Sequence, residues 1–357
     1  MTRTSKFFGF GLLPIAAFLA IGSVRSADVE PLTKAYKTET IDALVTAMKE
    51  DYVFPEVASK VDSDLHERLN KGEYDSVEQG AEFAKLLSEH MNALCKDAHL
   101  RVRFSKDDLP KREKRGEPSK EEIEQHERSM RLMNGGISSA ERLVGNVGYI
   151  DTTGFNQVDF AQRPIDAAMQ LVENTDALII DMRWNGGGHP QTVQYFCSYL
   201  FGPTPVHLND IEFRGEPKKE FWTLKELPGK RYVDKDVYVL CSKRTGSGAE
   251  EFCYNLKNLK RVTLIGESTW GGANPGGVVR INDHFSAFIP SGRAVSPYTG
   301  TNWEGTGVEP DIKIPFAEAL KAAHVMAVKK LLEKATDKRE KDRLTDALVA
   351  AEKGQLK

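Results

Sequence analysis

A serine flanked by two glycines, in Gly246-Ser247-Gly248, separates a strand pattern from a helical pattern. The apolar run 237–241 before it is typical of a buried strand, and after it apolar residues recur at helical spacing over 249–256. At a helix N-terminus, unpaired N–H groups and the helix dipole stabilise negative charge on a bound carbonyl oxygen. The position therefore suits a nucleophilic serine.

The same serine also fits a purely structural role. Ser247 and Glu250 have the Ser-x-x-Glu spacing of a capping box, in which the two side chains pair with backbone N–H groups at the start of a helix. Helix caps are much commoner than nucleophiles, so this stretch taken alone favours the cap. The rest of the chain has to decide between the two interpretations.

A second strand pattern also runs into glycines. The stretch 177–183 is continuously apolar at first and ends in charge, as in a strand covered on both faces, and it leads into Gly186-Gly187-Gly188 before a helical pattern begins at Thr192. If the two strands are neighbours, the N–H groups of Gly187 and Gly248 would converge as donors for an oxyanion. The glycines lack the spacing of a dinucleotide-binding loop, so no cofactor is expected.

A serine nucleophile needs a base, and the chain contains eight histidines. His99 begins a strand pattern beside Asp97, and His189 follows the second glycine loop; a lone histidine is more often structural than catalytic, so the residues alone leave both open. The other histidines are expected on polar helix surfaces (His66, His90, His126, His324) or in loops (His207, His284).

The elements that must position these residues indicate an α/β protein. The 357 residues are 40% hydrophobic with a formal net charge of -3 and no basic stripe, which is ordinary globular composition and argues against nucleic acid as a partner. Further strand patterns occur at 147–150, 262–265, 278–281 and 285–289. We expect a helical domain at 27–96, a strand and charged linker at 97–136, an α/β core at 137–316 and terminal helices at 317–357.

The first 26 residues have the pattern of a secretory signal peptide. Arg3 and Lys6 precede an uncharged apolar run, and small residues before Ser26 suit cleavage there, although an uncleaved anchor is the alternative. We therefore expect an exported protein, periplasmic or secreted, with no membrane span after cleavage. The four cysteines lie mostly in apolar patterns without metal-ligand spacing, so buried free thiols and no metal are expected, while the oligomeric state stays open.

Four ordered motifs carry a family resemblance. They are Asp181-x-Arg183-x-Asn185-x-Gly187-Gly188, Thr245-Gly-Ser-Gly-Ala-Glu250, Gly266-Glu267-x-Thr269-x-Gly271-Gly272, and Glu304-Gly-x-Gly-Val-x-Pro310-Asp311. Together the motifs resemble the C-terminal processing (tail-specific) serine protease family, in the branch with the tricorn core and the interphotoreceptor retinoid-binding protein repeats. The resemblance implies a ClpP/crotonase-like ββα spiral core with an N-terminal helical cap domain, and a peptide or protein substrate.

The resemblance also implies roles for single residues. The lysine base of the tail-specific branch falls at Gly272, so a Ser/Lys dyad is absent, whereas the histidine and glutamate of the tricorn-like branch match His99 and Glu304. Where the tricorn pattern has a serine before the histidine, this chain has Ala98, and the linker is too short for a PDZ module. The implied enzyme is an exported serine endopeptidase in which Ser247 attacks and His99 acts as base.

The remaining motif residues are expected to support the site. Asp181, Arg183 and Asn185 would hold the glycine loop by hydrogen bonds, and Glu250 and Glu267 are expected to be structural. Trp270 and Trp303 would either line a substrate groove or pack in the core.

Two other functions compete with the peptidase. A non-enzymatic binder of hydrophobic ligands or peptides, as the retinoid-binding relatives suggest, would keep Ser247 and His99 too far apart to hydrogen-bond. Acyl-CoA chemistry of the crotonase kind would need an oxyanion hole but no exposed serine, and the Ser247 turn argues against it. A fold does not decide among such functions, because one fold can carry several kinds of site.

Overall fold

A computed structural model describes residues 32–109 and 120–357. The predicted signal peptide at 1–26 lies outside the described residues, as do residues 110–119 of the predicted charged linker. No helix within the described part of the chain has the length and apolar character needed to span a membrane.

The described chain begins with three helices that share one apolar core. They are α1 (Lys34–Asp51), α2 (Pro55–Asn70) and α3 (Gly80–Cys95), which confirms the helical patterns read from the sequence. Strand β1 (Arg101–Phe104) follows immediately, so His99 lies in the short connection between α3 and β1.

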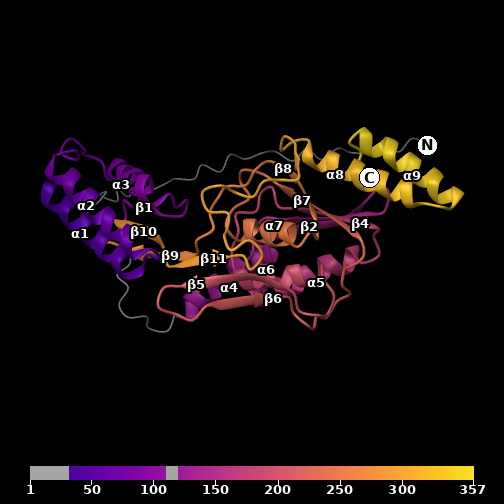
Figure 1. Cartoon of the computed structure of the whole chain (residues 1–357), viewed down its shortest axis with the longest axis horizontal. Helices are drawn as coiled ribbons and strands as arrows, with labels where there is room; N and C mark the ends of the chain where they lie inside the picture. Colours follow the sequence, from indigo (N-terminus) through magenta and orange to yellow (C-terminus); the bar gives the residue numbers. More distant parts are fainter. Residues whose placement is uncertain (1–31, 110–119) are drawn as a thin grey trace, which may run out of the picture. The chain divides into compact units, whose positions relative to one another are not determined.

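A hairpin from much later in the chain completes this core. Strands β9 (Gly276–Arg280) and β10 (Phe285–Pro290) confirm the two strand patterns predicted there, and they pair with β1 in the order β1-β10-β9. Phe285 and Ile289 pack among the apolar side chains of α1 to α3. Figure 1 shows β9 and β10, in orange, beside the indigo helices. The chain therefore returns to the helical part just after the Gly271-Gly272 segment.

A six-stranded mixed sheet forms the other main element, in the order β12-β8-β7-β4-β3-β2. Every neighbouring pair is parallel except β2 and β3, which are antiparallel. The strands are β2 (Ile137–Leu143), β3 (Val147–Thr152), β4 (Ala177–Asp181), β7 (Asp236–Cys241), β8 (Thr263–Gly266) and β12 (Ile312–Lys313).

Helices cover both faces of this sheet. Leu178 and Ile180 of β4 pack with α5 (Val158–Val172), α6 (Pro190–Ser198) and α7 (Gly248–Asn258). Ile179 points to the opposite face, which α8 (Ala319–Lys334) and α9 (Lys338–Glu352) cover, yellow in Figure 1. The uninterrupted apolar sequence of β4 is thus explained by burial on both sides, and the expected α/β class is confirmed at this level.

One small sheet was not predicted, and two histidines lie in other surroundings than those predicted. Strands β5 (His207–Phe213), β6 (Lys219–Trp222) and β11 (Gly292–Val295) form a sheet that was not predicted. His207, predicted in a loop, begins β5, where its ring stacks on Trp222. His324, predicted at the surface, is buried in α8 and its Nε2 lies 2.9 Å from the Val144 carbonyl oxygen. A buried polar partner explains why a histidine is tolerated there.

Two short elements lie in the range of the predicted linker, and the cysteines agree with the predictions. Helix α4 (Lys120–Leu132) lies within the predicted charged linker, and the short 3₁₀ turn η1 (Asn134–Gly136) follows it. All four cysteines are free thiols, and Cys197, Cys241 and Cys253 are buried.

Candidate active site

Ser247 lies in a tight turn between β7 and α7. Its backbone has φ 51° and ψ −122°, a conformation that residues other than glycine rarely adopt, and α7 begins at the next residue. A positive φ of this kind costs on the order of 1–3 kcal/mol and persists only where the surroundings impose it. Such strained turns present a side chain outward at the end of a strand, as at the nucleophile elbow of other hydrolases.

The two glycine loops meet because their strands are neighbours. Strands β4 and β7 pair in parallel, so their carboxyl ends lie at the same edge of the sheet, as the sequence analysis required. Gly187 has φ 98°, and a Cβ added to it would lie 2.5 Å from the Gly246 carbonyl oxygen and 2.8 Å from the Ser247 Cβ. Only glycine fits against the Ser247 turn at this position.

The N–H groups of the loops are not equally available. The Gly187 N–H donates to Asn185 Oδ1 at 2.9 Å, whereas the N–H groups of Gly188 and Gly248 donate no hydrogen bond within residues 32–109 and 120–357. A Cβ added to Gly248 would lie 3.0 Å from the Gly188 nitrogen, so the two free N–H groups are neighbours. Of the two predicted donors, Gly248 is free and Gly187 is engaged.

The polar residues of the first motif hold the glycine loop. The Arg183 guanidinium forms a salt bridge with Asp181 at 2.6 Å and donates to the Phe316 carbonyl at 2.6 Å. Asn185 is fully buried and receives the Gly187 N–H, while its own carbonyl accepts from the Gly246 N–H at 3.0 Å. These contacts support the structural roles expected from the sequence.

Glu250 joins the Ser247 turn to the Gly271-Gly272 segment. Its fully buried carboxyl accepts from the Ser247 N–H (2.9 Å), the Thr269 hydroxyl (2.5 Å), the Gly271 N–H (2.6 Å) and the Gly272 N–H (2.9 Å). The capping box predicted for Ser247 and Glu250 is present. Burial raises the pKa of Glu250, and the four donors oppose that shift.

His99 is enclosed by aromatic rings. Its side chain packs edge-on against Trp270, with ring centroids 4.8 Å apart, and stacks on Phe288 at 5.4 Å. Burial, reinforced by the charge of Arg101, lowers the pKa of His99 to about 4, so the imidazole is neutral at neutral pH. Its Nδ1 is buried and has no hydrogen-bond partner in the part of the chain that the structure describes.

The two rings also occupy the space beside Gly272. A Cβ added to Gly272 would lie 2.7 Å from His99 Cε1 and would collide with the Trp270 ring. A lysine cannot extend from this position while both rings remain where they are. Gly272 is the position at which the tail-specific branch of the resemblance has its lysine base. In this chain that position is therefore next to the imidazole of His99.

Glu304 lies close to His99 and to a second acid, Asp97. Ligand-type atoms of the three side chains lie within 4.8 Å of one another. Glu304 accepts from the backbone N–H groups of Ala98 at 2.8 Å and Ala273 at 2.5 Å. Burial and the nearby Asp97 carboxyl raise the pKa of Glu304 to about 7.

Asp97 is a residue to which the sequence analysis gave no role. One of its oxygens accepts from Asn274 Nδ2 at 2.9 Å and the other from the His99 N–H at 3.1 Å. Its position two residues before His99 was the available signal. Both acids direct their oxygens at protein donors, and this arrangement fits a charge network around His99 better than a metal site.

Ser247 and His99 are near each other but not bonded. The Glu250 Oε2 accepts from both Ser247 N–H and Gly272 N–H, and His99 lies against Gly272. No hydrogen bond joins the side chains of Ser247 and His99 within the described residues. The structure brings His99 and Glu304 together and holds Ser247 beside the glycine loops, with the Trp270 ring packed against both His99 and Gly246.

Two cavities border this cluster. One of about 620 Å³ is lined by Trp270, Ala98 and Glu304, and one of about 60 Å³ is lined by Ser247, Gly248 and Trp303. Trp270 is 41% exposed, whereas Trp303 is 2% exposed and donates its Nε1–H to the Gly272 carbonyl at 2.9 Å. Both tryptophans thus line a cavity at the cluster.

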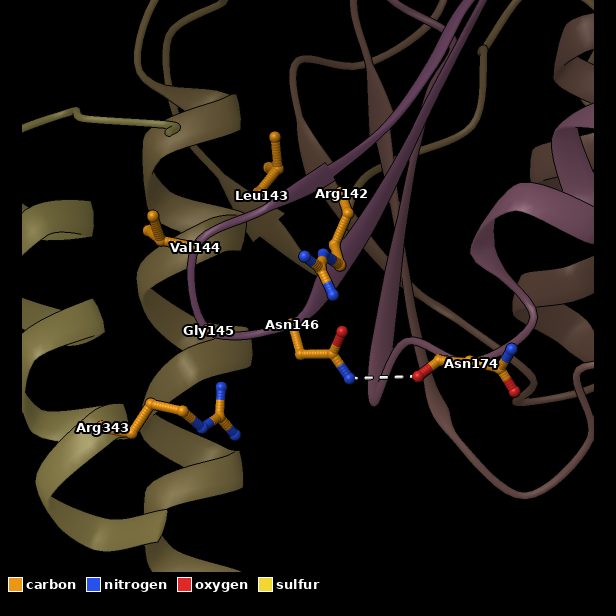
Figure 2. A pocket seen from close by; sticks show the side chains of 7 residues that line it. All are labelled: Arg142, Leu143, Val144, Gly145, Asn146, Asn174 and Arg343. Carbon is orange, nitrogen blue, oxygen red and sulfur yellow. Dashed lines mark hydrogen bonds between the residues drawn. The ribbon is translucent and has the colours of Figure 1, made fainter. Parts of the chain in front are cut away.

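A third cavity, of about 500 Å³, contains none of the predicted site residues. Figure 2 shows that it lies by the turn joining β2 to β3, where Arg142 and Arg343 extend from different elements near Asn146. None of the residues to which the sequence analysis assigned chemistry therefore lies at this cavity.

Comparisons with known proteins identify the family of the chain. Residues 146–314 match the family described as Peptidase family S41, and residues 32–135 match the N-terminal domain of that family in eukaryotic IRBP. The chain therefore belongs to peptidase family S41, a family of serine-type peptidases.

Individual relatives are distant. A carboxy-terminal-processing protease of Bartonella bacilliformis is 24% identical over 195 residues, which are 52% of this chain and 43% of that protein, so the chain spans less than half of its length. A Streptococcus agalactiae lipoprotein structure superimposes with a TM-score of 0.52 at 15% identity, covering 82% of this chain and 96% of that one. The photosystem II D1 C-terminal processing protease superimposes with a TM-score of 0.50 at 15% identity, covering 86% and 99%. These structures show a shared fold.

Proposed function

We propose that this chain is an exported serine endopeptidase that cleaves peptides or proteins by attack of Ser247, with His99 as general base. The observation that carries the proposal is the strained Ser247 turn, packed against a glycine loop that leaves two neighbouring N–H groups free. A nucleophile, oxyanion donors and a neutral base are the parts that acyl transfer requires.

In this mechanism Ser247 Oγ attacks the substrate carbonyl while His99 removes its proton. The oxyanion is held by the Gly248 N–H and, in place of the predicted Gly187, by the Gly188 N–H, because the Gly187 N–H is already bound to Asn185. His99 then returns the proton to the leaving amine, which breaks the C–N bond, and water hydrolyses the acyl-enzyme by the same steps.

Glu304 stabilises the imidazolium that forms on His99. Its carboxyl lies within 4.8 Å of the imidazole and carries a raised pKa, so its ionisation becomes more favourable when His99 gains a proton. Substrate binding brings His99 and Ser247 into hydrogen-bond contact by displacing Trp270, which is packed against both His99 and Gly246 and is partly exposed. Catalytic hydrogen bonds commonly tighten only in the substrate complex.

The finer fold and location belong to the same proposal. The core at 137–316 adopts the ClpP/crotonase-like ββα spiral, the range 27–96 forms the helical cap, and residues 1–26 direct export to the periplasm or the medium. Support comes from the resemblance of the four motifs and from the similarity to carboxy-terminal-processing proteases.

The test is covalent labelling of the protein without residues 1–26 by a fluorophosphonate probe. The wild type is expected to label once, at Ser247, and Ser247→Ala and His99→Ala are expected to lose labelling. His66→Ala serves as the matched control, because His66 binds Asp42 and Asp62 on the surface of the helical part. A wild type that stays unlabelled while its circular dichroism shows a folded chain would refute the proposed mechanism.

One observation favours a second function, the non-enzymatic binding of hydrophobic ligands or peptides. Ser247 and His99 form no hydrogen bond within the described residues, as that function predicted, and the cavity of about 620 Å³ beside Trp270 has room for a ligand. An unlabelled wild type with an apolar molecule bound at the exposed Trp270 ring, detected by quenching of tryptophan fluorescence, would support it.

A further inference from the structure

The cavity beside Ser247 has the features of a specificity pocket. It measures about 60 Å³ and is lined by Ser247 and the proposed oxyanion donors Gly188 and Gly248, together with Glu251, Ala273 and Trp303. Glu251 follows Glu250 on α7, so the two adjacent carboxyls point to different places. Glu250 holds the Gly271-Gly272 segment, whereas Glu251 lines the cavity.

The position of the cavity indicates which part of a substrate it would receive. The leaving amine must lie on the His99 side of the scissile bond, because His99 has to protonate it. Neither His99 nor Trp270 lines the small cavity, whereas Trp270 and Glu304 line the larger one. The small cavity is therefore on the acyl side, and it would hold the side chain of the residue whose carbonyl is attacked.

The size of the cavity restricts that side chain. A site that holds one water needs roughly 10–15 Å³ of such space, so about 60 Å³ takes only a few non-hydrogen atoms. The walls cannot easily yield, because Trp303 is 2% exposed and its Nε1–H is bound to the Gly272 carbonyl. Side chains the size of alanine, serine, threonine or valine fit, whereas aromatic, lysine and arginine side chains are too long.

Glu251 adds a polar requirement to this small site. The residue is 5% exposed, and its carboxyl faces the side-chain amide of Asn209, which donates to it and opposes the rise of its pKa on burial. The neighbouring Asn209 is fully buried, and no group other than Glu251 pairs with its amide within residues 32–109 and 120–357. A carboxylate can accept several hydrogen bonds, so a buried carboxyl with a single amide donor is under-satisfied, and a ligand hydroxyl that pairs with it recovers part of the cost of burial.

We propose that Glu251 is a specificity-determining residue that hydrogen-bonds the hydroxyl of a serine or threonine on the acyl side of the scissile bond. The inference rests on the proposed peptidase function. A hydroxyl both donates and accepts, so it can pair with Glu251 whether the carboxyl is protonated or ionised. The small apolar walls next to Glu251, such as Ala273 and Ala294, leave room for the threonine methyl group.

The test uses diphenyl aminoalkylphosphonate probes that carry a threonine, valine, serine or alanine side chain next to phosphorus. Attack by Ser247 forms the Oγ–P bond and releases one phenol, which takes up the serine proton, so the labelling rate reports directly on the side-chain pocket. We expect the threonine probe to label the wild type about 10–100-fold faster than the isosteric valine probe, the range of one buried hydrogen bond to a carboxyl.

Two variants isolate the carboxyl. Glu251→Leu should remove the threonine preference and favour the valine probe, while Glu251→Gln, which keeps the shape and a hydrogen-bonding group, should retain part of the preference. Each phosphonate rate is divided by the rate with a fluorophosphonate that lacks this side chain, and thermal unfolding confirms that each variant is folded.

The role of Glu251 and the peptidase function are distinguished by different outcomes. Two outcomes would overturn the role of Glu251 and leave the peptidase function intact, provided that the wild type reacts with the fluorophosphonate. One is equal labelling rates with the threonine and valine probes, and the other is no reaction with any of the four phosphonates. Failure of the wild type to react with the fluorophosphonate would overturn the proposed function itself.

Discussion

Replacement of Glu250 by glutamine tests how the site is held together. The carboxyl of Glu250 accepts four hydrogen bonds, two at each oxygen: Thr269 and Gly271 at Oε1, Ser247 and Gly272 at Oε2. Glutamine keeps one oxygen and replaces the other by an NH₂ group, which cannot accept a hydrogen bond. Whichever way the amide is oriented, two of the four donors lose their acceptor.

The magnitude follows from those two lost bonds. Hydrogen bonds to a charged group contribute about 1.5–3 kcal/mol each, so Glu250→Gln should lower the free energy of unfolding by about 3–6 kcal/mol. The same change loosens the Gly271-Gly272 segment, against which His99 rests, so the rate of fluorophosphonate labelling should also fall. Urea unfolding followed by circular dichroism gives the first quantity, and labelling of the folded fraction gives the second.

The adjacent residue supplies a matched control. Glu251 is also buried and lies on the same turn of α7, but its carboxyl faces the Asn209 amide in place of the four donors that Glu250 binds. Because burial opposes the ionisation of Glu251, Glu251→Gln at pH 7 should leave the chain at least as stable as the wild type. If Glu250→Gln proved as mild as Glu251→Gln, the claim that Glu250 joins the nucleophile turn to the loop beside His99 would be wrong.

Three further changes have outcomes that follow from the geometry. Ser247→Gly should relieve the strain of φ 51° and make the fold about 1 kcal/mol more stable while abolishing labelling; a less stable variant would mean that the turn is not strained. Gly272→Ala places a Cβ 2.7 Å from His99 Cε1, so it should lower the free energy of unfolding by about 1–3 kcal/mol and slow labelling. Gly277→Ala is the control, because no atom lies within 4 Å of its added Cβ, and it should change neither quantity. Burial raises the pKa of Glu251 from 4.5 to about 8, so the folded chain keeps a proton that the unfolded chain releases between these values. Stability should therefore fall as the pH rises from about 4.5 to about 8, by up to about 5 kcal/mol, and Glu251→Gln should remove this slope in unfolding curves recorded across that range.

Local pattern was sufficient to predict much of the site. The two strand, glycine loop and helix units appear in the sequence because apolar periodicity and glycine placement act over a few residues, and β4, β7 and α7 formed where those patterns indicated. Glu304 and His99 were paired by their resemblance to family motifs, and their side chains do lie close together.

Elements that depend on distant partners were harder to predict. Strands β5, β6 and β11 were missed, since a short edge strand is stabilised by its neighbours more than by its own sequence. The β9-β10 hairpin was expected from its sequence, but nothing local indicated that it would pack among α1 to α3. His324 has a polar helical context, and only packing against the turn before β3 explains its burial.

The sequence by itself determined which residues could do chemistry: a serine between glycines at a helix start, a glycine loop after a buried strand, and a histidine and a glutamate in motif positions. Only the tertiary structure decided which N–H groups are free, since the engagement of Gly187 depends on the Asn185 side chain. It also decided that two adjacent residues have different surroundings: the Glu250 carboxyl binds N–H groups of Ser247, Gly271 and Gly272, whereas Glu251 lines the small cavity. The reason is physical: periodicity specifies the local backbone, whereas hydrogen-bond partners, burial and the pKa of a side chain depend on segments that folding brings together.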